Sequence, residues 1–209
     1  MSELSIKNIN TGVKITFVLG FTLMAISFYV GKVNLFLLLN GNLGLFADRF
    51  FEYTTYLGDG AIWVPIAVFF FIYRRKYLVL LFAAILFSTL FTQVTKNFIF
   101  PELPRPTKLI ENIQLIHTVP GVELHTIDSF PSGHTTTAFT VFLLACLFIP
   151  IKKIIPIGLV IALLVGYSRV YLAQHFPLDV GAGMIAACLT MLLSIQMQKW
   201  REANQTLFN

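Results

Sequence analysis

Two histidines in this sequence have the surroundings that phosphate chemistry requires. His134 follows Pro131, Ser132 and Gly133 where an apolar run begins, and His175 stands four residues before Asp179. A carboxylate that holds one imidazole nitrogen fixes the tautomer, so the other nitrogen can attack as a nucleophile. A second imidazole can then give a proton to the leaving oxygen. The two histidines therefore suit a reaction with a covalent intermediate.

Three cationic side chains, Lys96, Arg105 and Arg169, could bind the oxygens of an anion. Ser132 and Gly133 would add backbone N–H groups at a helix start, where the helix dipole also favours negative charge. Taken singly, these residues have ordinary roles, such as a lysine that reaches the membrane surface or a serine that caps a helix. Their combination favours phosphoryl transfer, in which catalysis is largely positioning and charge stabilisation.

A metal site is not expected. His117 and His125 have no cysteine or carboxylate cluster at ligand spacing around them, which argues against zinc. Glu102 and Asp128 are interpreted as solvated loop residues. The chemistry outlined above needs neither a metal nor another cofactor.

The composition indicates a membrane protein. Of the 209 residues, 56% are hydrophobic and only 12% are charged, whereas soluble domains carry about 25% charged residues. The high apolar content also excludes a disordered chain. The two cysteines, Cys146 and Cys188, lie inside apolar runs and do not suggest a disulfide scaffold. The net charge of +5 forms no basic stripe with interleaved aromatics, so no nucleic-acid partner is expected.

Six apolar segments are expected to position the candidate side chains, since a spanning helix needs about 20 mainly apolar residues. They are residues 15–30, a segment from 55 or 61 to 73, then 77–95, 132–150, 154–171 and 178–197. The first is interpreted as an uncleaved span, because no small-residue cleavage site follows it. The sequence thus predicts an all-α polytopic membrane bundle with six transmembrane helices, and residues 1–209 as one domain.

Two other segments are too polar, or too often interrupted by proline, to form a transmembrane helix. Residues 34–56 mix apolar residues with Asp48, Arg49 and Glu52, which predicts an outer interfacial amphipathic segment. Residues 96–131 hold five of the nine prolines and are interpreted as a loop.

Clusters of basic residues predict the orientation of the chain in the membrane. Arg74–Lys76, Lys152 with Lys153, and Lys199 with Arg201 follow the second, fourth and sixth predicted spans. The positive-inside rule places such clusters in the cytoplasm. Both termini are therefore expected in the cytoplasm, and the candidate residues, which lie near the opposite ends of the spans, are expected outside.

These groups resemble the signature of the type 2 phosphatidic acid phosphatase superfamily. Its pattern is a Lys followed by Arg-Pro, then Pro-Ser-Gly-His, then Ser-Arg-x5-His-x3-Asp. The second part matches at Pro131–His134 and the third at Ser168–Asp179, whereas eight residues instead of six separate Lys96 from Arg105. The resemblance covers roughly residues 55–198.

The resemblance implies a helical lipid phosphatase without a metal. His175 would become phosphorylated, Asp179 would orient it, and His134 would protonate the leaving group and later activate water. The phosphate-binding residues would be Lys96, Arg105, Ser132, Gly133 and Arg169.

Several alternatives stay open at this point. The pocket could serve a haloperoxidase-like oxidation, or a transporter or bundle could bind an anion without turnover. Undecaprenyl diphosphate, phosphatidylglycerol phosphate, phosphatidic acid and the lipid A phosphates are all compatible substrates, and the loop over residues 108–125 could select among them. The expected location is the cytoplasmic membrane of a bacterium, with the site facing the periplasm or exterior. The sequence does not give the oligomeric state.

Overall fold

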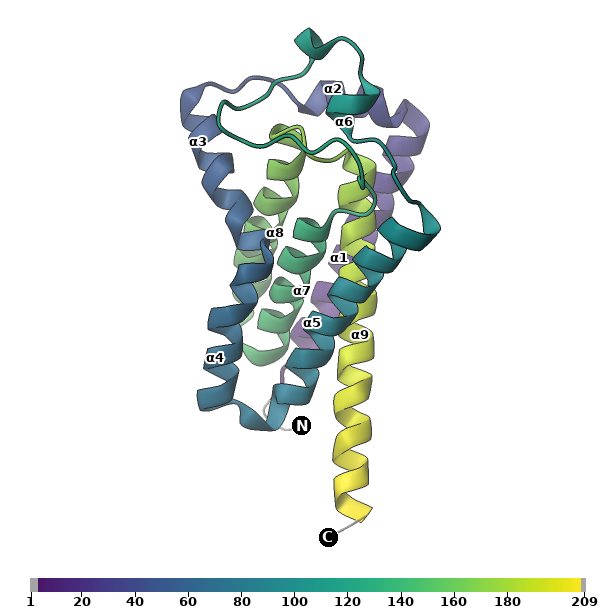
Figure 1. The fold of residues 1–209 in the computed structure, drawn as a ribbon. Helices are drawn as coiled ribbons and strands as arrows, with labels where there is room; N and C mark the ends of the chain where they lie inside the picture. The colour runs from purple at the N-terminus through teal and green to yellow at the C-terminus, as the bar shows by residue number, and fades with distance from the viewer. Residues whose placement is uncertain (1–3, 208–209) are drawn as a thin grey trace.

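The apolar runs form long helices that lie side by side in the computed structural model, which describes residues 4–207 (Figure 1). The longest are α1 (Ile6–Val30), α5 (Leu78–Val94), α8 (Ile154–Tyr171) and α9 (Pro177–Leu207). Over the described residues no strand occurs, and the predicted all-α membrane bundle is confirmed.

By length and composition, the described residues offer four or five candidate spans, where the sequence predicted six. Four helices are long and apolar enough to cross a membrane, and a bent pair of helices, Leu45–Gly58 with Gly60–Tyr73, would make a fifth. The remaining apolar helix, α7 (Gly133–Phe148), has 16 residues. Its first turn begins inside the bundle, below the end of α8 and the start of α9 (Figure 1). We call the end of the bundle that carries the loop over residues 96–131 the outer end, after the orientation predicted from the sequence. The count of six is therefore not confirmed.

The segment predicted to be interfacial is divided in the structure. The helix α2 (Lys32–Leu39) lies at the outer end, whereas α3 (Leu45–Thr54) descends toward α4 (Trp63–Tyr73) (Figure 1). Two 3-10 turns, η1 (Thr55–Gly58) and η2 (Gly60–Ile62), join α3 to α4 with a bend of 56°. The polar residues that argued against a span are paired, since Arg49 bonds Glu52 at 2.7 Å and Asp48 contacts His117 and Tyr171.

The helix α7 occupies the centre of the bundle and packs against α1, α5, α8 and α9. The helices α1 and α9 approach so closely that a Cβ on Gly20 would lie 2.9 Å from the carbonyl oxygen of Gly181. Such close contacts between small residues are common where membrane helices pack. The central α7 thus brings its first turn next to the ends of its neighbours.

The loop over residues 96–131 covers one end of the bundle (Figure 1). It contains a π-helical turn, η4 (Thr95–Ile99), a short helix, α6 (Pro106–Leu109), and a 3-10 turn, η5 (Ile113–Leu115). A further 3-10 turn, η3 (Arg75–Tyr77), joins α4 to α5 at the other end.

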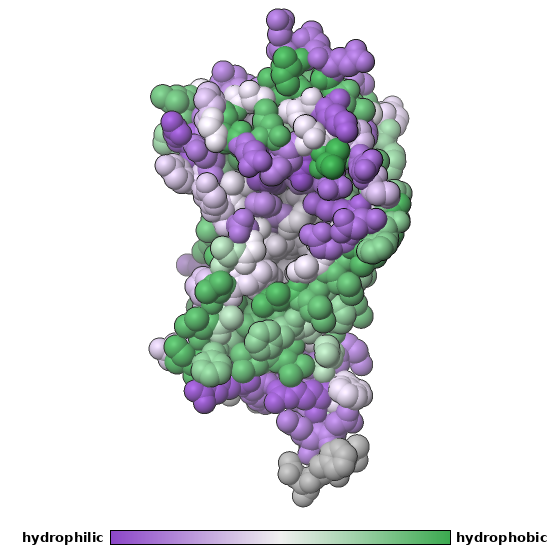
Figure 2. Space-filling model, in the orientation of Figure 1, coloured by the Kyte–Doolittle hydropathy of each residue, from purple (hydrophilic) through white to green (hydrophobic). Residues whose placement is uncertain are grey.

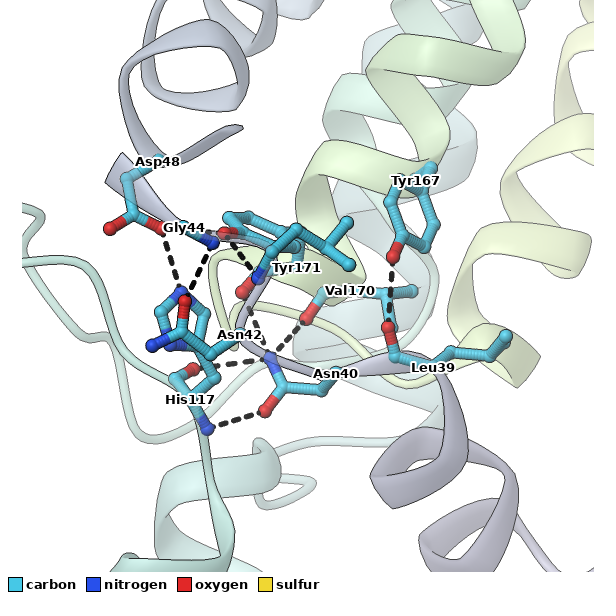
Figure 3. Close-up of polar contacts among 10 residues, drawn as sticks. Leu39, Asn40, Asn42, Gly44, Asp48, His117, Tyr167, Val170 and Tyr171 are labelled. Carbon is cyan, nitrogen blue, oxygen red and sulfur yellow. Dashed lines mark hydrogen bonds and ion pairs between the residues drawn. The ribbon is translucent and has the colours of Figure 1, made fainter. Parts of the chain in front are cut away.

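A polar network anchors this loop to the bundle (Figure 3). The Asn40 amide nitrogen donates to the carbonyls of Val170 and Tyr171, both at 2.9 Å, and to that of His117 at 3.1 Å. One Asp48 carboxylate oxygen lies 2.9 Å from His117 Nε2 and accepts a 2.5 Å bond from the Tyr171 hydroxyl. The network therefore joins the segment between α2 and α3, the outer loop and the end of α8.

The basic clusters share the opposite end of the bundle. The Lys76 carbonyl accepts bonds from Gln198 at 3.1 Å and from Arg201 at 2.9 Å, and Figure 1 shows the turn between α7 and α8 at the same end. Figure 2 shows a hydrophobic band between this polar end and the polar outer end, which is the surface of an integral membrane protein.

Candidate active site

A polar cavity of about 290 Å³ opens between α5, the η1–η2 bend and the first turn of α7. Of the eight predicted site residues, six line it, and they come from four separate segments of the chain. They are Lys96, Arg105, Gly133, His134, Arg169 and His175. Figure 2 shows polar and intermediate residues in this region, above the hydrophobic band.

Lys96 reaches the cavity from the π-helical turn η4 at the end of α5. The chain then passes through an irregular loop that contains Pro101 and Pro104, and it returns to the cavity at Arg105, directly before α6. The longer spacing between the two cations is therefore compatible with a shared cavity, because a wide turn and an irregular loop take up the extra residues.

Arg105 is buried, and main-chain oxygens hold its guanidinium. Its Nε donates to the Ile127 carbonyl at 2.8 Å, and its Nη1 donates to the Gln174 carbonyl and side-chain oxygen at 3.1 and 3.2 Å. Burial lowers the pKa of Arg105, and the carboxylates of Asp179 and Asp128 oppose this. Arginine stays charged in proteins, so the guanidinium is a fixed cation at the cavity wall.

Arg169 lies in the last turn of α8, and only 6% of its surface is exposed. Its Nη1 donates to the Thr55 hydroxyl at 2.5 Å, whereas its buried Nε has no partner among the described residues. A buried, unpartnered N–H is costly, so Arg169 has donor capacity that an anion in the cavity would satisfy.

The first turn of α7 supplies backbone donors. Ser132 caps the helix, and its hydroxyl oxygen accepts from the Thr135 hydroxyl at 2.9 Å. Ser132 is fully buried, and its own N–H donates to the Asp179 carbonyl at 3.0 Å. The amides of Gly133 and His134 remain as first-turn N–H groups, which lack intrahelical acceptors.

His175 lies in the turn between α8 and α9, next to Asp179 in the first turn of α9. The His175 Nδ1 is buried and lies 3.5 Å from Asp179 Oδ2 without making a hydrogen bond. That carboxylate oxygen is held by the Ser129 hydroxyl at 2.5 Å and by the Phe176 N–H at 2.9 Å. Burial, followed by the charges of Arg105, Arg169 and Lys96, lowers the pKa of His175 well below its ordinary value. The surroundings therefore favour the neutral imidazole.

The turn that carries His175 is itself held at several points. The N–H groups of Gln174 and His175 both donate to the Arg169 carbonyl, at 2.8 and 3.0 Å. Ala173 adopts a left-handed φ of 55°, a conformation that non-glycine residues keep only where the surroundings enforce it. The position of the imidazole is thus set by the main chain as well as by Asp179.

His134, in the first turn of α7, faces a carboxylate that the sequence analysis did not select. Its Nε2 lies 3.9 Å from Asp59 Oδ2, at the bend between η1 and η2. Sequence reasoning also missed Thr55, Gln174 and Ser129, which contact Arg169, Arg105 and Asp179 respectively. Only Asp59 carried a signal, as a carboxylate between two glycines in an apolar stretch.

Within residues 4–207, no group of three or more His, Cys, Asp or Glu side chains is placed to hold a metal ion. His117 instead pairs with Asp48, and His125 lines the cavity 4.0 Å from Glu123. The donor set at the cavity, with cations and backbone N–H groups around two imidazoles, is one that binds a tetrahedral oxyanion.

Comparison with known proteins identifies relatives that are phosphatases. The family model described as the PAP2 superfamily matches residues 77–203. An undecaprenyl-diphosphatase of Sulfolobus acidocaldarius is 29% identical over 169 residues, which are 80% of this chain and 78% of that protein.

Two solved structures share the fold. Aquifex aeolicus LpxE has a TM-score of 0.67 and 32% identity, over 78% of this chain and 93% of its own. A PAP2-type phosphatidylglycerolphosphate phosphatase of Bacillus subtilis has a TM-score of 0.62 and 24% identity, over 91% of this chain and 96% of its own. At that identity the second structure supports the fold alone.

Proposed function

The chain belongs to the PAP2 superfamily and is a membrane lipid phosphatase, and we propose that it releases the terminal phosphate of a lipid diphosphate through a phosphohistidine intermediate. The convergence of six motif residues on one polar cavity carries this proposal. Undecaprenyl diphosphate is the substrate we favour, because a relative that aligns with 80% of this chain is an undecaprenyl-diphosphatase.

In the first step, a nitrogen of His175 attacks the terminal phosphorus while the bond to the bridging oxygen breaks. Nδ1 faces Asp179 at 3.5 Å, so Nε2 is the attacking atom and Asp179 stabilises the imidazole as it gains positive charge. His134 gives its proton to the bridging oxygen, which leaves as the lipid monophosphate. The products of this step are phospho-His175 and the lipid monophosphate.

In the second step, water attacks the phosphorus of phospho-His175. His134, now neutral, takes a proton from this water. The nitrogen–phosphorus bond breaks, inorganic phosphate leaves, and both histidines return to their starting states. One water is consumed for each phosphate released.

Charge stabilisation comes from three cations and the first turn of α7. Lys96, Arg105 and Arg169 bind the non-bridging oxygens, together with the amides of Gly133 and His134. Arg169 is the principal donor, because its Nε has no protein partner. Most donors of Arg105 already bind carbonyls, so it acts mainly as a fixed charge. We assign Ser132 to supporting the helix start rather than to direct phosphate binding.

The site faces the periplasm or exterior of a bacterial cytoplasmic membrane in this proposal. The clusters at Lys76 and Arg201 share the end of the bundle opposite the outer loop, and such clusters favour the cytoplasm. The loop over residues 108–125 contributes to headgroup selection, since His125 lines the cavity and the Glu123 carbonyl accepts a 2.8 Å bond from Gln174.

Phosphate release from purified protein tests the proposal. Detergent-solubilised protein is given undecaprenyl diphosphate, phosphatidylglycerol phosphate, phosphatidic acid and lipid A in parallel, with a His175→Ala variant as control. We expect release of inorganic phosphate, fastest from the diphosphate, and none with the variant. Rapid quenching with labelled substrate should trap an acid-labile, alkali-stable phosphoprotein. Binding of these lipids without phosphate release would favour an anion-binding bundle or transporter instead.

A further inference from the structure

The bend between η1 and η2 forms a wall of the cavity that the motif residues do not account for. Gly58 and Gly60 line the cavity, and Asp59 lies between them. The family model begins at residue 77, so this wall comes from outside the matched segment. Thr55, one turn earlier, already accepts the hydrogen bond from Arg169.

The bend approaches α7 more closely than a side chain would allow. A Cβ on Gly58 would lie 2.7 Å from the His134 carbonyl oxygen and 2.7 Å from a Val165 methyl carbon. Glycine at this position therefore lets the bend contact the backbone of His134 directly. The next residue, Asp59, is brought beside the imidazole as a result.

The two oxygens of Asp59 have different surroundings. Oδ1 accepts a 2.8 Å bond from the Ala61 N–H and so caps η2. Oδ2 lies 3.9 Å from His134 Nε2. A carboxylate within a stretch apolar enough to be part of a span is costly and marks a functional position, and capping a three-residue turn uses only one of its oxygens.

We propose that Asp59 is a positioning residue for His134, so that the site contains two histidine–carboxylate pairs. This inference rests on the proposed acid and base role of His134. Asp59 Oδ2 keeps the imidazole in one orientation, with the other nitrogen toward the leaving oxygen. Once that nitrogen has given up its proton, Asp59 also fixes the tautomer of the neutral ring. Asp59 touches neither the phosphate nor the water.

The charges around His134 make such a partner necessary. Lys96, Arg105 and Arg169 line the same cavity, and all three oppose the positively charged imidazole that must donate a proton. The other carboxylate of the site, Asp179, is directed at His175. Asp59 is the nearby negative charge that favours the protonated imidazole at the start of each turnover.

The test uses Asp59→Asn, which changes one atom of the contact. Asparagine keeps an oxygen that can cap η2 and replaces the oxygen facing His134 by an amide nitrogen. We expect kcat to fall roughly 10–100-fold, part of the 10²–10⁴-fold that general acid–base catalysis supplies, with KM nearly unchanged. Asp59→Glu should recover part of the loss. Undecaprenyl diphosphate and phosphatidic acid serve as the two probes.

A double-mutant cycle separates positioning from structure. In a His134→Gln background, Asp59→Asn should cost little further turnover, because the group on which Asp59 acts is gone. Glu52→Gln is the matched control, since it makes the same chemical change on α3, where Glu52 pairs with the exposed Arg49, and it should leave turnover unchanged. If the Asp59→Asn variant fails to fold, the Asp59→Ser variant is used in its place, since serine also retains an oxygen that can cap η2.

The outcomes distinguish the two proposals. The role of Asp59 is overturned if the wild-type protein releases phosphate and the Asp59→Asn variant is equally active. It is also overturned if Asp59→Asn lowers turnover by the same factor in the His134→Gln background. Both results leave the phosphatase proposal standing. Wild-type protein that releases phosphate from neither probe overturns both. The Asp59–His134 pair is supported if Asp59→Asn lowers turnover when His134 is present and has little effect in the His134→Gln background.

Discussion

Replacing Gly133 by alanine is expected to separate stability from turnover. A Cβ on Gly133 would meet no heavy atom within 4 Å, and its φ is not among the positive ones. Gly133 lies in the first turn of α7 and lines the cavity, so the open space beside it is the proposed phosphate position. Alanine is favoured over glycine in helices by up to about 1 kcal/mol. The folded state should therefore be unchanged or slightly stabilised.

The same methyl group should obstruct the phosphate. An oxygen that accepts from the Gly133 N–H lies at about 2.9 Å from the nitrogen, which leaves it close to the new Cβ. The phosphoryl group would have to move by a large fraction of an ångström, and misplacement by about 1 Å can cost on the order of 10²-fold in rate. We expect a loss of turnover of about that size.

Thermal unfolding and phosphate release, measured on the same detergent preparation, test this reasoning. The unfolding midpoint should stay level or rise by up to roughly 2–4 °C, as 1 kcal/mol gives for a chain of this size. Gly41→Ala, also without a neighbour within 4 Å but in the linker between α2 and α3, should leave both readouts unchanged. Gly183→Ala should instead lower stability, because its Cβ would lie 2.8 Å from the Ser132 carbonyl oxygen. Full turnover by the Gly133→Ala variant would refute a phosphate position beside Gly133. A loss of turnover accompanied by a lower unfolding midpoint would refute it as well.

Three further changes have defined outcomes. Arg169→Ala should lower phosphate release by at least about 10²–10³-fold, as the loss of an oxyanion donor does, while circular dichroism stays helical; retained activity would remove Arg169 from the site. Asp179→Asn should cost up to about 10⁴-fold, the loss seen when a carboxylate that orients a catalytic histidine becomes an amide, and quenched reactions should contain less phosphoprotein; equal trapping would contradict an orienting role. A cysteine at the exposed Glu111 should react with a membrane-impermeant maleimide on intact cells, with little background from the buried Cys146 and Cys188; labelling only after permeabilisation would reverse the orientation.

The sequence predicted which motif residues come together, but it did not predict the residues that surround and hold them. The motif residues are recognisable because a phosphate requires cations, N–H donors and a nucleophile, and only a few side chains supply them. Their convergence also followed from topology, since the ends of alternate spans meet at one membrane face. Six of the eight expected residues line one cavity, and Asp179 lies directly behind His175.

Residues that act through other residues could not be identified in this way. Gln174 contributes through two contacts, to Arg105 at 3.2 Å and to the Glu123 carbonyl at 2.8 Å, and a glutamine before a histidine has no pattern that predicts either. Ser132 was assigned to the phosphate because a helix start offers N–H groups. The Asp179 carbonyl accepts its N–H, a pairing that depends on how α7 and α9 pack.

The bent helix pair shows how the segment over residues 34–56 can carry charges next to a candidate span. Charged residues argue against a span when they are counted singly, because each carries its own desolvation cost. In the fold, Asp48 is satisfied by His117 and Tyr171, which are 69 and 123 residues away in the chain. The cost of the charge is offset by partners that no window of sequence contains.

The polar network at the outer end links this bend to catalysis. Asn40 binds the carbonyls of Val170 and Tyr171, directly before the turn that presents His175, and Tyr171 in turn binds Asp48 on α3. The same α3 continues into the bend that carries Thr55 and Asp59. The turn that carries His175 and the bend that carries Asp59 are therefore linked through α3 and the polar contacts of Asp48 and Asn40, whereas the apolar helix faces below them lie toward the bilayer. A strongly apolar chain can hold buried charges because they have polar partners at this end of the bundle. Main-chain carbonyls hold Arg105, the Thr55 hydroxyl holds Arg169, and the Ser129 hydroxyl and the Phe176 N–H hold Asp179.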